Sequence, residues 1–60
     1  MYGFKATYEN KKTLEERNVL IEINEQYHES EEEIFISAIT LSLKEKRVSE
    51  CFCSLEFLYC

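Results

Sequence analysis

The chain has 60 residues, of which 45% are hydrophobic and 32% charged, and its formal net charge is −5. This length predicts a single domain over residues 1–60 that buries only about 60% of its unfolded surface, which leaves little room for a deep substrate cavity. The negative charge comes from 12 acidic residues, all of them Glu, and it disfavours direct binding to nucleic acid or to an anionic membrane surface.

The N-terminal segment predicts a strand. Tyr2, Phe4, Ala6 and Tyr8 alternate with small, polar or charged residues. This period of two is typical of a strand that is buried on one face, here mainly by aromatic side chains.

A polar, charged stretch over residues 10–17 follows and predicts a hairpin loop. Thr13 and Glu16 could instead form a capping box that begins a helix. The apolar residues after them fit a helical stripe poorly, whereas Val19, Ile21 and Ile23 alternate with Asn18, Leu20, Glu22 and Asn24. We therefore expect a second strand over residues 18–24.

The middle of the chain predicts a helix from Ser30 to about Arg47. Ser30 and Glu33 have the spacing of a capping box, in which the Ser30 hydroxyl accepts from the Glu33 N–H and the Glu33 carboxylate returns to the Ser30 N–H. Acidic residues in the first turn and basic residues in the last suit the helix dipole. The apolar arc consists of Ile34, Phe35, Ala38, Ile39, Leu41 and Leu43. The β-branched residues of 34–43 leave a strand as the alternative.

The last segment, residues 49–60, predicts a third strand. Its inner face is expected to carry Cys51, Cys53, Leu55, Phe57 and Tyr59. The resulting order predicts an α+β fold of the type β-β-α-β, a small three-stranded antiparallel sheet with the first strand central and one helix packed on one face.

The acidic stretch before and inside the helix start is the strongest candidate for a binding surface. Tyr27 lies within it and could serve as an aromatic anchor. The candidate binding residues are Glu25, Tyr27, Glu29, Glu31, Glu32 and Glu33. The alternative interpretation is a solvated helix start whose carboxylates only complement the dipole.

The other reactive side chains give no catalytic or metal signature. Cys51 and Cys53 are separated by one residue on a predicted strand, which holds their sulfur atoms too far apart for a shared zinc ion or a normal disulfide. We expect both to be buried as small apolar side chains. Cys60 could be exposed. His28 is expected in an exposed loop, without the partners of a catalytic triad. We therefore expect no enzyme activity, no cofactor and no metal.

Composition and cysteine usage indicate the expected setting. Three cysteines cannot all pair within one chain, and no apolar run approaches the roughly 20 residues of a membrane span, so we expect a cytoplasmic protein that neither enters nor binds a membrane. Abundant Lys, Glu, Ile and Asn suggest a small bacterial or phage reading frame.

The function expected from these features is protein binding. The sequence predicts a small acidic binding module, such as a phage-encoded or bacterial inhibitor, that docks on a basic surface of a nucleic-acid enzyme. The alternative is a structural protein or homodimer that associates through a sheet edge or its C-terminal strand.

Overall fold

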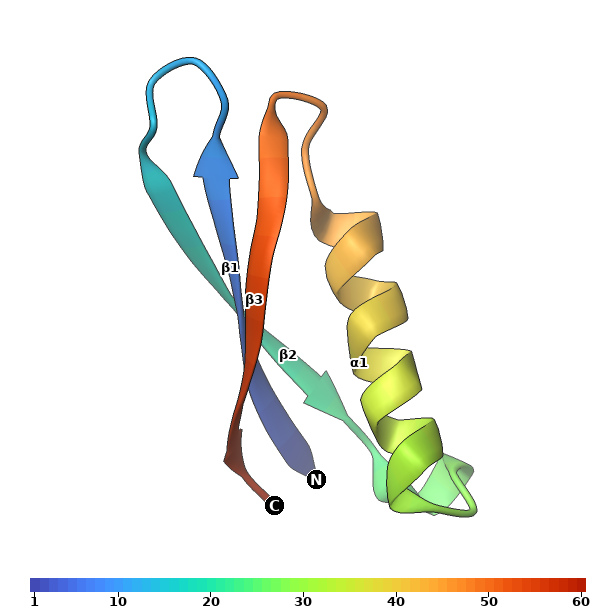
Figure 1. Cartoon of the computed structure of the whole chain (residues 1–60). Helices are drawn as coiled ribbons and strands as arrows, with labels where there is room; N and C mark the ends of the chain where they lie inside the picture. The colour runs from blue at the N-terminus through green and yellow to red at the C-terminus, as the bar shows by residue number, and fades with distance from the viewer.

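The computed structural model describes residues 1–60 and contains one sheet and one α-helix (Figure 1). Their order is β1 (Tyr2–Asn10), β2 (Glu16–Ile23), the 3₁₀ turn η1 (Glu25–Tyr27), α1 (Glu31–Glu45) and β3 (Glu50–Tyr59). Both β2 and β3 pair antiparallel with β1, which gives the strand order β2-β1-β3. The predicted β-β-α-β fold with a central first strand is therefore confirmed.

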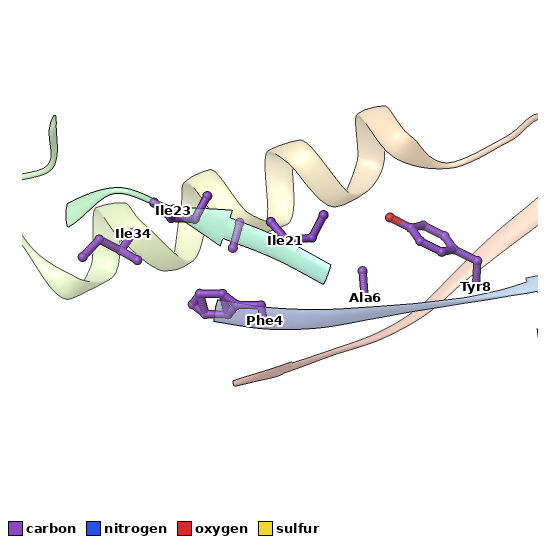
Figure 2. Packing of buried hydrophobic residues seen from close by; sticks show 7 residues of the cluster. Phe4, Ala6, Tyr8, Ile21, Ile23 and Ile34 are labelled. Atoms are coloured by element: carbon purple, nitrogen blue, oxygen red, sulfur yellow. The ribbon is translucent and has the colours of Figure 1, made fainter. Parts of the chain in front are cut away.

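The core lies between α1 and the facing side of the sheet, as Figure 2 shows. Phe4, Ala6 and Tyr8 of β1 are buried there, together with Ile21 and Ile23 of β2. The period-two pattern of β1 and β2 therefore predicted their buried face correctly. Alternate side chains of a strand point to the same face, and in these two strands that face is the one covered by α1.

The helix begins where the capping pattern predicts. Ser30 is the N-cap, and its hydroxyl accepts from the Glu33 N–H at 3.3 Å. The Glu33 carboxylate accepts from the N–H of Glu29 at 2.8 Å, one residue earlier than the predicted Ser30. Residues 34–43 are thus helical and the strand alternative is wrong, although the helix ends at Glu45, two residues before the predicted end.

The buried side of α1 is narrower than the predicted arc. Only Ile34, Ala38 and Ser42, spaced four residues apart, are buried. Ser42 is small enough for the helix to approach β1, and its backbone carbonyl accepts a 2.6 Å hydrogen bond from the Tyr8 hydroxyl. Three members of the predicted arc are exposed instead, namely Phe35, Leu41 and Leu43.

The predicted inner face of β3 is wrong at three positions. The register with β1 shifts twice, so that Cys53 and Leu58 are extra residues without a partner in the pairing. Each extra residue reverses the alternation of the strand. Leu55 and Phe57 keep the predicted face, opposite Ala6 and Phe4, and Phe52 joins them. Cys51, Cys53 and Tyr59 are exposed.

An ion pair joins the segments at the hairpin-loop end of the sheet. The Arg17 guanidinium donates to both carboxylate oxygens of Glu50, at 2.8 Å each, and lies 4.6 Å from the centre of the Tyr8 ring. Arg17 also donates to the Glu45 carbonyl at the end of α1. Because β2 begins at Glu16, Arg17 is a strand residue and not part of the predicted loop.

No helix in the structure is both long enough and apolar enough to cross a membrane.

Candidate functional site

The predicted binding residues all lie at one end of the molecule. They occupy η1, the segment after it and the first turn of α1, at the bottom of Figure 1. Asn24 begins η1, and its side-chain oxygen accepts from the Gln26 N–H at 3.0 Å. We call the six residues Glu25, Tyr27, Glu29, Glu31, Glu32 and Glu33 the acidic end.

Two carboxylates of the acidic end have contacts within the chain. Glu25 lies against the N-terminal ammonium group, whose hydrogen bond lowers the pKa of this carboxyl. Glu33 caps the Glu29 N–H. The side chains of Glu29, Glu31 and Glu32 form no hydrogen bond or ion pair within the chain, so these three are available to an outside cation.

Exposed apolar side chains accompany these charges. Tyr27 is 82% exposed. Glu31 and Glu32 line a shallow hollow together with Phe35 and Ile36, which are 48% and 61% exposed. Large exposed apolar groups beside charges are common in protein-binding surfaces. The contribution of Phe35 and Ile36 was not predicted from the sequence, because Phe35 was expected in the buried arc and Ile36 was not among the candidate binding residues.

A second apolar feature continues from this hollow, between α1 and β3. A groove of about 350 Å³ is lined by Tyr2, Phe4, Glu31, Ile34, Phe35, Phe57 and Cys60. The ring of Phe35 packs edge-on against Phe4, and the Phe57 ring packs against Phe4 and Tyr2. We call this feature the α1–β3 groove. Its aromatic walls are held by ring-to-ring contacts, and Glu31 lies at its rim.

The opposite end of the molecule carries nearly all of the positive charge. It consists of the β1–β2 loop, the α1–β3 loop and the adjoining ends of the strands and of α1, at the top of Figure 1. A hydrogen bond from the Lys11 N–H to the Ser49 carbonyl joins the two loops. Six of the seven basic residues lie there: Lys11, Lys12, Arg17, Lys44, Lys46 and Arg47. Five glutamates lie there as well: Glu9, Glu15, Glu16, Glu45 and Glu50. The chain extends 39 Å along its longest axis, so the two charged ends are well separated.

His28 is more constrained than expected. It is partly buried, with Nε2 2.7 Å from the Ser37 hydroxyl and Nδ1 3.0 Å from the Asn24 carbonyl. A serine, a histidine and an orienting acceptor are parts of a hydrolytic site. Acyl transfer also needs N–H donors for an oxyanion, and the N–H groups around Ser37 lie inside α1, where the helix uses them. In this structure the pair connects η1 to the helix.

The cysteines do not converge with other ligands. Cys51, Cys53 and Cys60 are all free and exposed, which corrects the expected burial of the first two. No group of three or more His, Cys or Glu side chains is arranged to hold a metal ion.

Comparisons with protein-family models, with curated proteins and with solved structures gave no match.

Proposed function

We propose that the chain is a protein-binding module whose acidic end docks on a basic surface of another protein. The observation that carries the proposal is the segregation of charge. The acidic end holds five glutamates without a neighbouring Lys or Arg, while six of the seven basic residues lie at the opposite end, where five other glutamates offset most of their charge. Such a field orients a basic partner toward one end of the molecule during encounter and raises the association rate.

The exposed apolar groups at the acidic end add binding affinity that surface charge alone does not provide. Exposed ion pairs contribute little affinity each, whereas buried aromatic anchors dominate many interfaces. Tyr27 is almost fully exposed, and Phe35 and Ile36 adjoin Glu31 and Glu32. We infer that carboxylates orient the partner and that these three apolar side chains become buried on binding.

The chemistry of the surface defines the class of partner. Closely spaced carboxylates complement Lys and Arg side chains that otherwise contact phosphate, so a basic groove of a nucleic-acid enzyme fits the acidic end. The module acts as a competitor of nucleic acid there and has no catalytic role of its own. Three exposed thiols favour a reducing compartment, and we place the protein in the cytoplasm of a bacterial or phage-infected cell.

The test is capture of the partner by matched charge-reversal variants. Glu31→Lys with Glu32→Lys reverses two free carboxylates of the acidic end, and Glu15→Lys with Glu16→Lys makes the same change of charge at the opposite end. We expect the first pair to abolish capture from a bacterial lysate and the second to retain it. Circular dichroism checks folding, because Lys in the first turn of a helix opposes the dipole.

Two further measurements separate the components of binding. Tyr27→Ala removes the exposed ring without a change of charge and is expected to weaken capture. Added heparin, a soluble polyanion, is expected to release the captured protein if its basic surface is a phosphate-binding one. Equal capture by both reversal variants, or equal loss in both, would contradict a localised acidic binding surface.

A further inference from the structure

The middle of the free edge of β3, residues 54–57, lacks the features that protect most sheet edges. Of the two edge strands, β2 carries Glu16, Arg17 and Glu22 within eight residues. β3 carries two charged side chains, the buried Glu50 at its start and Glu56, whose carboxylate lies 3.7 Å from the Lys5 ammonium. Edge strands are usually protected by Lys, Pro, β-bulges or inward charges, since their unpaired N–H and C=O groups otherwise pair with another strand. The buried Glu50 and the extra residues Cys53 and Leu58 protect the ends of β3, so residues 54–57 are the part of this edge that is open to another strand.

The side of α1 next to this edge is apolar and only partly covered. Phe35 lines the α1–β3 groove, and Ile39 and Leu43 follow it at intervals of four residues, on the same side of the helix. Leu43 is 52% exposed and Phe57, on the opposite wall, is 54% exposed. The groove and the free edge thus form one continuous apolar strip.

We propose that a second copy of this chain occupies the strip, with the two β3 strands paired antiparallel in a continuous six-stranded sheet. A two-fold axis perpendicular to the sheet keeps both helices on the same face. Each helix then turns its Phe35, Ile39 and Leu43 side toward the other across the paired β3 strands. One interface covers both the free edge and the apolar side of the helix.

Charge complementarity selects a second copy as the occupant. The two-fold axis reverses one copy relative to the other, so the acidic end of each lies beside the basic end of its neighbour. Glu31 and Glu32 at the start of one helix lie near Lys44, Lys46 and Arg47 at the end of the other. A parallel arrangement would bring the two acidic ends together and is disfavoured by their repulsion.

The bulges and Glu56 restrict the register. The regular part of β3 between the extra residues Cys53 and Leu58 is residues 54–57, and pairing is centred there. Directly opposite residues in an antiparallel pair share a face, so a residue lies opposite its own copy at the two-fold axis. Centring on Leu55 places Ser54 opposite Glu56, whereas centring on Glu56 places two carboxylates together. Ser54 and Phe57 adjoin the extra residues at the two ends of this part, so we assign the axis to Leu55.

Sedimentation equilibrium in reductant, over a range of concentrations, tests the dimer. Reductant is needed because the exposed thiols could otherwise link two chains. Leu43→Lys introduces a charge on the side of α1 that faces the second copy. Leu20→Lys is the matched control, since Leu20 is 53% exposed on β2 and receives the same charge. We expect the wild type and Leu20→Lys to dimerise alike, and Leu43→Lys to raise the dimer Kd by about tenfold or more.

Hydrogen exchange on the wild type provides a second, independent readout. Amides of residues 54–57 that point away from β1 are expected to exchange slowly in the dimer and rapidly after dilution to monomer. A monomer at all concentrations, equal weakening by both Lys variants, or a dimer in which these amides exchange rapidly would each overturn the proposal. The dimer covers Phe35 and sets Glu31 and Glu32 beside the second copy, so a second copy and a basic partner compete for the acidic end. Leu43→Lys leaves the acidic end itself unchanged and is expected to capture the basic partner at least as well as the wild type. Loss of the dimer with capture retained therefore separates this inference from the proposed function.

Discussion

Single polar contacts between distant residues hold the hairpin-loop end of the molecule together. Arg17 and Glu50 are 33 positions apart, and their two hydrogen bonds join the starts of β2 and β3. The Arg47 N–H adds a third bond to the same carboxylate. The residues around Arg17 and around Glu50 in the sequence do not indicate this pairing, because the pairing depends on β1 bringing β2 and β3 together. The ion pair could therefore not be predicted from the sequence.

The ion pair predicts a specific acid dependence of stability. The hydrogen bonds that the Glu50 carboxylate accepts from Arg17 lower the pKa of Glu50 to about 2, below the usual carboxyl value of 4.5. A carboxyl whose pKa is lowered in the folded state stabilises it above the unfolded value and loses this contribution as the pH falls toward 2. We expect Glu50→Gln to unfold at a lower temperature than the wild type at pH 7, with a gap that narrows between pH 4.5 and 2. A constant gap across this range in thermal unfolding would contradict the assignment.

A second residue in the same region is conformationally strained. Leu14 has a φ of 63°, in the left-handed region, and no other residue of the chain has a positive φ. Its side chain is 67% exposed, so it gains little from packing. Leu14→Gly is expected to raise the free energy of unfolding by up to about 1 kcal/mol, measured by urea denaturation. The control is Leu20→Gly in β2, which should be destabilising; a loss in both variants would mean that the strain at Leu14 is negligible.

For the helices and strands, some features depend only on neighbouring residues in the sequence, and others depend on contacts with distant segments. The alternation in β1 and the capping residues around Ser30 operate over a few neighbouring positions, and both were predicted correctly. The faces of β3 depend on extra residues at Cys53 and Leu58 that only pairing with β1 creates. The buried stripe of α1 likewise depends on Tyr8, whose hydroxyl reaches the Ser42 carbonyl.

The reversed faces of β3 predict the reactivity of its thiols. Cys51, Cys53 and Cys60 are exposed, so a disulfide reagent such as DTNB should modify all three in the folded monomer at high dilution. Single Cys→Ser variants assign each thiol, and unfolded protein gives the reference rate. Protection of Cys51 or Cys53 until unfolding would mean that β3 has the face predicted from its sequence.

At the scale of the whole molecule, charge polarity is the feature on which the account depends. This polarity could be predicted in part, because the acidic run is visible in the sequence. The position of six basic residues at the other end could not, because only the fold brings their segments together. The α1–β3 loop and the β1–β2 loop meet there only because β3 and β2 flank the same strand. The same polarity orients either a basic partner toward the acidic end or a second copy in the antiparallel direction, and the two compete for Glu31 and Glu32.

The most direct test of the acidic end is an NMR titration of the ¹⁵N-labelled chain with the captured partner. The account predicts that amide shift changes concentrate in residues 24–36, with Tyr27 and Phe35 among the largest, and that Glu31→Lys with Glu32→Lys removes them. Shift changes centred on Lys11 and Lys12, or spread evenly over the sheet, would contradict it.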